Sequence, residues 1–216
     1  MTTRRAGLRE QKKQATREAL SAAALRLALE RGPDDVRVDD IAEAAGVSPR
    51  TYNNYFSSRE QAIVAAVAGE REARIAAAVA GRPVGVGLAA ALVEAVVEAY
   101  TTASEPGRDA LLLITTRPSL REAFVGTTGA IENPLAGAIA GRLGDDDERT
   151  ARVLAASVAA AVRIALEGWL QTTAASFTAG GLVVPSGSLP DLLRATLAPL
   201  TPALDAAEER ARRRPR

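Results

Sequence analysis

Residues 38–56, VDDIAEAAGVSPRTYNNYF, contain the pattern that decides the predicted fold. Two short helices are expected at about 38–45 and 49–55, close enough in sequence to form a helix-turn-helix. Gly46 is expected to end the first helix, because glycine adopts the left-handed backbone of such a turn without steric cost. Ser48 followed by Pro49 is typical of a helix N-terminus, with the serine as its cap.

The apolar residues of this stretch predict how the two helices pack. The inward residues of the first helix and the turn are expected to be Ile41, Ala42, Ala45 and Val47. In the second helix, a four-residue spacing predicts that Ser48, Tyr52 and Phe56 point inward. The outer face is then left to Arg50, Asn53 and Asn54.

This outer face has the chemistry of DNA recognition. Arginine can donate two hydrogen bonds to guanine O6 and N7, and asparagine can bond adenine N6 and N7. Thr51 and Tyr55 can bond phosphates or touch a thymine methyl group. Asparagine is a poor helix former, so Asn53 and Asn54 on an exposed helix gain nothing structurally. The alternative is an αα-turn of an ordinary bundle, whose polar face is merely solvated.

The chain before and directly after the motif is also predicted to be helical. A first helix at about 8–31 places Leu20, Ala24, Leu27 and Ala28 on one face, with Arg9, Lys13 and Arg17 on the polar side. Gly32-Pro33 ends it. A fourth helix runs from Ser58 to about residue 80, with Ser58 and Gln61 as a capping box.

The rest of the chain predicts an all-α fold with the helix-turn-helix near its N-terminus. Strand patterns are nearly absent, and turns rich in Gly and Pro separate the apolar helical segments. These segments are expected at about 86–103, 107–116, 118–142, 147–178 and 189–210. The acidic run Asp145–Glu148 is expected to lie at the positive N-terminus of the long helix 147–178.

The composition excludes several classes of protein. The 216 residues include no Cys and no His, which excludes thiol nucleophiles, a Ser-His-Asp triad and the usual zinc sites. No cofactor or metal is expected, and a binding protein is favoured over an enzyme. Charged residues interrupt the most apolar windows, so a membrane span is not expected, and the charged N-terminus does not read as a secretory signal.

Basic charge is concentrated at the chain ends, although the formal net charge is only +1. Six of the first 17 residues are Lys or Arg, against the single acidic residue Glu10. Such a run next to a helix-turn-helix favours contact with DNA phosphates or the minor groove. Arg212, Arg213, Arg214 and Arg216 form a second basic run, for which a function and plain solubility remain equal alternatives.

Residues 10–63 resemble the DNA-binding domain of the TetR family of bacterial repressors. The matching pieces are AALRLALERG (23–32), VDDIAEAAGVS (38–48), TYNNYF (51–56) and SSREQAI (57–63). The resemblance implies a DNA-binding domain at 1–62 and a ligand-binding and dimerisation domain at 63–216. The segment LLLITTRPSLREAF (111–124) is similar to regulators of the mycofactocin-regulator type.

The resemblance implies which residues meet DNA. Pro49, Arg50, Thr51, Asn53 and Tyr55 would face the major groove or its rims, and Arg59 would hold a phosphate. Arg37 stands where the family usually has a hydroxyl residue and could make a phosphate contact instead. Position 53 is commonly aromatic in the family, so Asn53 replaces a stacking or phosphate contact with a possible base reader. With the N-terminal run, the predicted DNA-binding set is Arg4, Arg5, Lys12, Lys13, Arg37, Ser48, Pro49, Arg50, Thr51, Asn53, Asn54, Tyr55 and Arg59.

The larger half is expected to form the homodimer and to bind a small-molecule effector. The resemblance implies that helices 147–178 and 189–210 form the dimer face. Helix 147–178 carries rows of small residues that permit close packing, and the alternative is an intramolecular core; these residues are Ala151, Ala155 and Ala159, with Val158 and Val162. Candidate ligand-binding residues are the scarce aromatics and nearby charges: Tyr100, Arg117, Arg121, Phe124, Arg163, Glu167 and Trp169.

The sequence thus predicts a cytoplasmic, nucleoid-associated regulator that binds double-stranded DNA as a homodimer. It is expected to be a repressor that a small molecule releases from a palindromic operator. The alternatives are an architectural nucleoid protein without an effector and, less favoured, a helical ligand carrier or enzyme.

Overall fold

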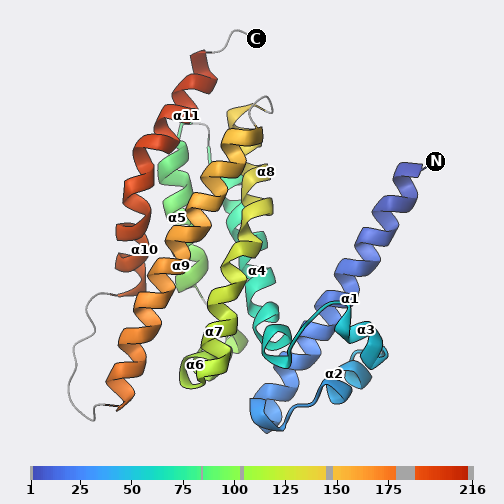
Figure 1. Cartoon of the computed structure of the whole chain (residues 1–216). Coiled ribbons are helices and arrows are strands. Elements are labelled where there is room, and N and C mark those ends of the chain that lie inside the picture. Colours follow the sequence, from blue (N-terminus) through green and yellow to red (C-terminus); the bar gives the residue numbers. More distant parts are fainter. Residues whose placement is uncertain (1, 84, 103–104, 145–147, 179–187, 214–216) are drawn as a thin grey trace. The chain divides into compact units, whose positions relative to one another are not determined.

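The computed structural model describes residues 2–83, 85–102, 105–144, 148–178 and 188–213. Within these ranges the side chains of residues 2–8, 10, 70, 105–108 and 172–178 lie outside the description. Every described element is helical, which confirms the all-α prediction (Figure 1). Contacts divide the chain into two compact units: unit 1 comprises Met1–Val67 and Asp109–Phe124, and unit 2 comprises Ala68–Arg108 and Val125–Arg216.

Unit 1 is built around the helix-turn-helix. Its elements are α1 (Thr2–Arg31), the 3₁₀ turn η1 (Pro33–Asp35), α2 (Val38–Ala44), α3 (Pro49–Asn53), the first turns of α4 (Arg59–Gly81) and most of α6 (Glu105–Thr116) and α7 (Pro118–Gly126). Leu20, Ala24, Leu27 and Ala28 are buried, as the pattern predicts. The first part of α1 extends beyond α2 and α3 as a single helix (Figure 1).

Helix α1 begins at Thr2 and not at about residue 8 as predicted. Once a helix is nucleated, adding a residue costs little, and the Arg, Leu, Glu, Gln and Lys residues of this stretch are good helix formers. Gly7 is not enough to stop propagation.

Unit 2 is a helical bundle formed by the remainder of the chain. Besides the rest of α4, it contains α5 (Leu88–Thr101), η2 (Thr127–Ile131), α8 (Glu132–Leu143), α9 (Glu148–Thr178), α10 (Leu189–Leu197), η3 (Ala198–Leu200) and α11 (Thr201–Arg213). The long helix α9 packs against α8 and α10, and α5 packs against α10 and α11. The predicted acidic cap of α9 lies at 145–147, outside the described residues, and α9 is described from Glu148.

Two of the predicted helices are interrupted. The segment 118–142 divides into α7, η2 and α8, because Gly126, Thr127, Thr128 and Gly129 are poor helix formers and the chain tightens into a 3₁₀ turn. The segment 189–210 divides into α10, η3 and α11. Pro199 lies in η3 and lacks the backbone N–H that a continuous helix needs.

The row of small residues on α9 does not form an exposed dimer face. Ala151, Ala155, Val158, Ala159 and Val162 are all buried inside the chain. The prediction of a dimer face there is wrong, and the alternative of an intramolecular core is correct. Small residues let α9 approach its neighbours closely within the same chain, and sequence alone does not say which chain supplies the neighbour.

Helix α9 is apolar on more than one side. Its stretch Glu148–Gln171 is long and apolar enough to cross a membrane, with a mean hydropathy of 1.6, but half of the tested window is buried inside the protein. Core helices of soluble proteins pass the same test, so this is weak evidence for a span.

The chain passes between the two units three times. The first passage lies inside α4 after Val67, the second inside α6 after Arg108, and the third inside α7 after Phe124. The proposed functional division at residue 62 stays a prediction. The packing adds that a short segment from the middle of the chain, Asp109–Phe124, belongs with the N-terminal unit.

Candidate nucleic-acid interface

The turn between α2 and α3 is closed by backbone hydrogen bonds. Val47 N–H donates to Ala42 O (2.9 Å) and Gly46 N–H donates to Glu43 O (3.0 Å), which is the Schellman pattern of a helix C-terminus. Gly46 has a φ of 68°, so the left-handed backbone predicted for it is confirmed. At the other end of α2, the Arg37 N–H donates to the Asp40 carboxylate at 3.2 Å.

Ser48 caps α3, but it does not point inward as predicted. Its Oγ accepts a hydrogen bond from the Thr51 N–H at 3.1 Å, and the residue is exposed. A capping side chain folds back onto the first turn of its own helix, which keeps it at the surface. The prediction from the four-residue spacing is therefore wrong at Ser48, where capping of the helix competes with packing in the interior.

The inner face of α3 is held by two aromatic residues. Tyr52 and Phe56 are buried, with ring centroids 5.8 Å apart. The Tyr52 hydroxyl donates to Ser58 O at 2.8 Å, which ties α3 to the start of α4. Burial, assisted by the negative charge of Glu60, raises the pKa of Tyr52 to about 12, so the phenol keeps the proton that it donates.

The outer face of α3 is open. Pro49, Arg50, Asn53 and Asn54 are exposed, while Thr51 and Tyr55 are half-buried at its edge. None of the ion pairs among the described side chains engages Arg50. A rigid inner face and an open outer face leave these polar groups available to base edges.

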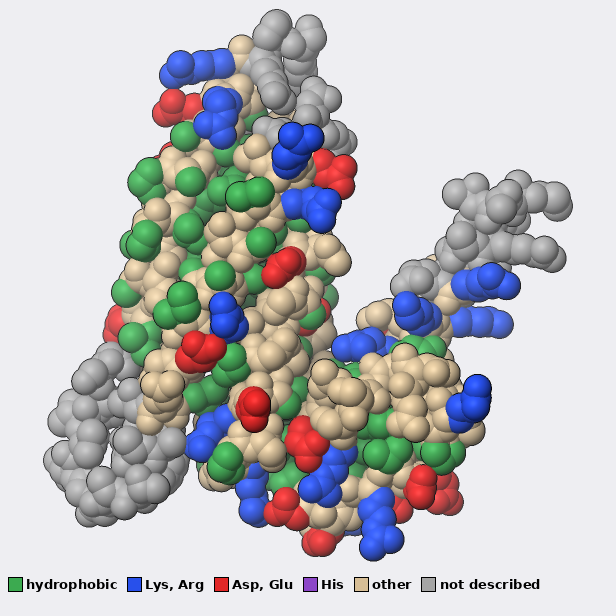
Figure 2. Space-filling model, viewed as in Figure 1, with side chains coloured by type: hydrophobic (Ala, Val, Ile, Leu, Met, Phe, Trp, Pro, Cys, Tyr) green, Lys and Arg blue, Asp and Glu red, His purple; other side chains and the backbone are tan. Residues whose placement is uncertain are grey.

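Helix α1 presents a group of exposed basic side chains. Arg9, Lys12, Lys13 and Arg17 are exposed. Figure 2 shows Lys and Arg side chains, in blue, gathered along this helix. The side chains of Arg4 and Arg5, which belong to the same prediction, lie outside the described residues.

Arg17 has a positioning role that the sequence did not reveal. Its guanidinium lies 4.7 Å from the centroid of the Phe56 ring, and its NH1 donates to Tyr55 O at 3.4 Å. Such a cation–π contact contributes about 0.5–1 kcal/mol at an exposed site. Arg17 thereby joins the basic helix to the end of α3, although 38 residues separate the two along the chain.

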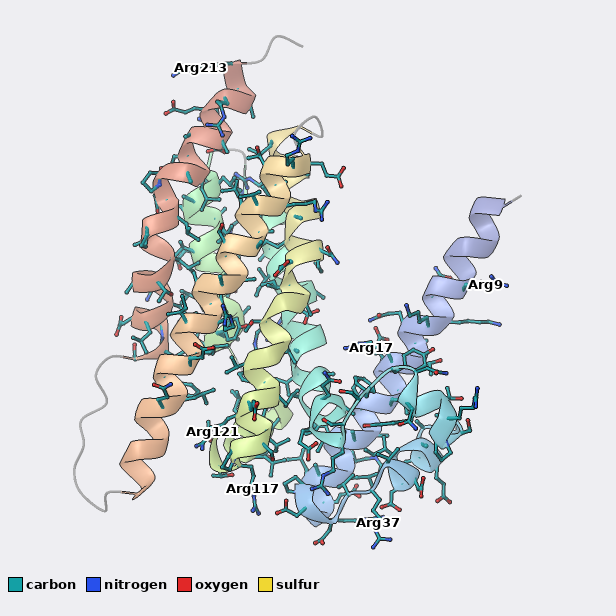
Figure 3. All side chains as sticks on the ribbon, viewed as in Figure 1. Arg9, Arg17, Arg37, Arg117, Arg121 and Arg213 are labelled. Carbon is teal, nitrogen blue, oxygen red and sulfur yellow. The ribbon has the colours of Figure 1, made fainter. Side chains whose placement is uncertain are left out.

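Arg37 and Arg59, the predicted phosphate contacts at the starts of α2 and α4, differ in how free their side chains are. Arg37 is exposed, and its side chain points away from the start of α2 (Figure 3). The Arg59 guanidinium instead donates to Asp34 O (2.9 Å), Val36 O (3.2 Å) and the Glu60 carboxylate (2.8 Å). Arg59 holds the loop before α2 in place, and its phosphate contact stays a prediction.

The predicted ligand-binding residues are divided between the two units. Arg117, Arg121 and Phe124 belong to unit 1, and Tyr100, Arg163, Glu167 and Trp169 belong to unit 2. Arg163 pairs with Glu167 at 3.6 Å on the exposed side of α9, which is a surface ion pair. Phe124 is buried, and Tyr100 lies beneath the guanidinium of Arg71 at 4.3 Å. Burial lowers the pKa of Arg71, while Tyr100 acts in the opposite direction.

Two hollows are described in unit 2, and none of the seven residues lines either. A cavity of about 270 Å³ between α4 and α5 has walls formed mostly by alanines, with Arg74 and Glu98 at its edge. A wider groove of about 810 Å³ runs between α8 and α9. Because neither hollow involves the predicted set, the seven residues stay a prediction.

The helix-turn-helix has a rigid aromatic inner face and an open polar outer face, and a basic helix lies next to it. These features define a DNA-binding protein of the helix-turn-helix class. Comparison with known proteins then identifies its kind. A model of the bacterial regulatory proteins of the TetR family matches residues 20–66, and a model of the MftR C-terminal domain matches residues 82–205. The HTH-type transcriptional regulator TcmR of Streptomyces glaucescens is 32% identical over 175 residues, covering 76% of each chain.

The chain belongs to the TetR family of bacterial transcriptional regulators. Solved structures with a similar arrangement include a Rhodococcus sp. protein assigned to this family (TM-score 0.45, 20% identity, 88% of this chain and 99% of that chain). NalD of Pseudomonas aeruginosa, the secondary repressor of the MexAB-OprM multidrug efflux pump, gives a TM-score of 0.38 at 19% identity, covering 87% of this chain and 96% of that chain. The family assignment rests on the sequence comparisons.

Proposed function

We propose that this regulator is a homodimeric repressor that binds a palindromic operator and is released from it by a small molecule held in unit 2. The observation that carries the proposal is the division of α3 into a buried aromatic face and an exposed face with Arg50, Asn53 and Asn54. A dimer would place two such helices about 34 Å apart, in successive major grooves. Like other regulators of its class, it would work in the cytoplasm, on the nucleoid.

Release would act through the helix that the units share. Because α4 begins in unit 1 at Arg59 and ends in unit 2 at Gly81, a ligand that shifts α4 also shifts the part of this helix that packs in the DNA-binding unit. If the separation of the two α3 helices of the dimer changed, only one of them could still enter the major groove of its half-site.

Arg50→Ala is expected to cost about 1–3 kcal/mol of binding to the preferred operator and to relax the preference at one base pair of each half-site. The reason is the loss of a bidentate contact to guanine. Asn53→Ala should do the same at an adenine. The measurement is binding to an operator selected from random DNA, to its single-base variants and to random DNA, at one fixed salt concentration.

Arg26→Ala is a matched control, because Arg26 is an exposed residue of the same unit whose ion pair among the described side chains is with Glu30 on α1. It should leave the ranking of operator variants unchanged. If Arg50→Ala and Asn53→Ala also leave that ranking unchanged, α3 does not read bases, and an architectural DNA binder without an operator becomes the better account.

Neutralising both Lys12 and Lys13 with alanine is expected to weaken binding to operator and random DNA by the same factor. Both side chains are exposed on the projecting part of α1, where they would meet phosphates. The slope of log K against log salt should fall by about one unit for each lost phosphate contact. Arg26→Ala with Arg31→Ala removes two charges from the other end of α1 and should keep the full slope. An unchanged slope in the Lys12 and Lys13 variant would make this part of α1 a solubility feature.

A further inference from the structure

The segment Asp109–Phe124 is tethered to unit 2 at both ends although it packs in unit 1. The chain before it, up to Arg108, and the chain after it, from Val125, belong to unit 2. A rearrangement in unit 2 that moves either end would therefore pull on this segment through the covalent chain. The segment is a mechanical connection between the units that is separate from α4.

The corner between α6 and α7 lies in the middle of this segment and is internally braced. The Arg121 guanidinium donates to Thr115 O at 3.2 Å, and the Arg121 N–H donates to Arg117 O at 3.0 Å. Leu120 and Phe124 are buried beneath the corner. Arg117 therefore projects from a corner whose backbone is held in place by these contacts.

Arg117 forms an ion pair with the loop that leads into the helix-turn-helix. Its NH1 lies 3.1 Å from one carboxylate oxygen of Asp34, which is part of η1 (Arg117 is labelled in Figure 3). The other carboxylate oxygen of Asp34 lies 3.9 Å from the NH2 of Arg59. Asp34 therefore lies between an arginine of the α6–α7 corner and the arginine that begins α4.

Polar contacts continue from Arg59 to the recognition helix. The Arg59 Nε lies 2.8 Å from the Glu60 carboxylate, and Ser58 also bonds this carboxylate. Burial alone would raise the pKa of Glu60, but hydrogen bonds from Arg59, from its own backbone and from Ser58 lower it, so Glu60 stays ionised. The carbonyl of Ser58 accepts the hydroxyl of Tyr52, the buried anchor of α3.

We infer that the Asp34–Arg117 ion pair is a latch within unit 1, which holds the α6–α7 corner to the loop before α2 and transmits changes in unit 2 to α3 in parallel with α4. The inference deepens the proposed function and rests on it for the part that concerns DNA. Asp34 and Arg117 are positioning residues here, since they act through Arg59, Glu60 and Tyr52 and touch no base.

The Asp34–Arg117 ion pair is a weak interaction, so it can break and form again when the protein changes state. The side chains of Asp34 and Arg117 are 65% and 49% exposed, and solvent screens their attraction. Pairs of this kind couple their partners by a factor of up to about fivefold. A change of that size lies at the lower end of the coupling between allosteric sites and is reversed easily.

Hydrogen exchange of the full chain, with and without a selected operator duplex, tests the latch. In the unmodified protein, operator binding should slow amide exchange both in 38–54 and in Asp109–Phe124, the latter by up to about fivefold. In Arg117→Gln, the slowing should persist in 38–54 and vanish in Asp109–Phe124. If it persists in both, or is absent from Asp109–Phe124 in the unmodified protein, the inference is wrong.

A second arm without DNA separates this inference from the proposed function. Arg117→Gln and Asp34→Asn should each speed exchange in 38–54, and the double variant should exchange as Asp34→Asn does alone, because one interaction is lost once. Arg26→Gln breaks a similarly exposed pair of unit 1 and should change nothing there. Additive effects would overturn the latch. A protein that selects no operator would overturn the proposed function while this arm still decides the latch.

Discussion

Replacing Arg142 by Met is expected to lower the free energy of unfolding of unit 2 by about 3–5 kcal/mol, the cost of breaking a buried ion pair from one side. The side chains of Arg142 and Glu208 are only 11% and 13% exposed, and the Arg142 NH2 lies 3.7 Å from the Glu208 carboxylate. Methionine keeps much of the volume but leaves Glu208 with Arg212, at 3.3 Å, as its other cation among the described ion pairs.

The loss is large because Arg142 also satisfies backbone groups. Its guanidinium donates to the carbonyls of Val79, Arg82 and Val86, where α4 ends and the chain turns toward α5. Glu208 in turn accepts from the Leu88 N–H at 3.1 Å at the start of α5. Without the guanidinium, carbonyl groups at this turn lose their partners in a partly buried place.

The measurement is chemical denaturation followed by circular dichroism, at one protein concentration so that any association contributes equally. Arg163→Met is the matched control, since Arg163 and Glu167 form an exposed pair at 3.6 Å in the same unit. That change should stay within about 1 kcal/mol. Equal effects of the two substitutions would show that burial does not determine how much the Arg142–Glu208 pair contributes to the free energy of unfolding.

In the proposed homodimer, Ile164→Glu is expected to produce a folded monomer and to weaken operator binding by about 10²–10⁴, because two linked half-sites are replaced by one. Val153 and Ile164 are 61% and 56% exposed on α9. Eleven positions separate them, about three helical turns, so they lie on one face, and half-buried Ala160 falls between them. The buried row that includes Ala155 lies on the opposite side.

A second substitution on α9 distinguishes this face from the core. Ala155→Arg would place an unpaired charge in the interior and should unfold unit 2, not release a monomer. Leu112→Glu changes a residue of unit 1 that is 62% exposed and should leave the dimer intact. Light scattering and denaturation separate these outcomes. A dimer that survives Ile164→Glu would move the interface away from this face of α9.

Sequence patterns were sufficient to predict the features that depend on neighbours within a few residues. The cap at Ser48, the left-handed backbone at Gly46 and the inward aromatics Tyr52 and Phe56 all follow from local backbone geometry and helical spacing. The same short-range rules predicted the exposed face of α3 and hence the class of the protein. They failed where two local demands competed, as at Ser48, and where a proline such as Pro199 lay inside an apolar pattern.

Which distant groups meet, and which apolar face of a helix stays exposed, depends on the tertiary fold. Arg142 bonds carbonyls 56 to 63 residues away, and Leu88 and Glu208 are 120 residues apart. Helical periodicity shows that α9 has an apolar row with Ala155 and another with Val153 and Ile164. It does not show which of the two rows is buried by the rest of the same chain. Hydrogen bonds within a helix turn are set by the backbone of consecutive residues, whereas long-range pairs depend on how the whole chain returns on itself.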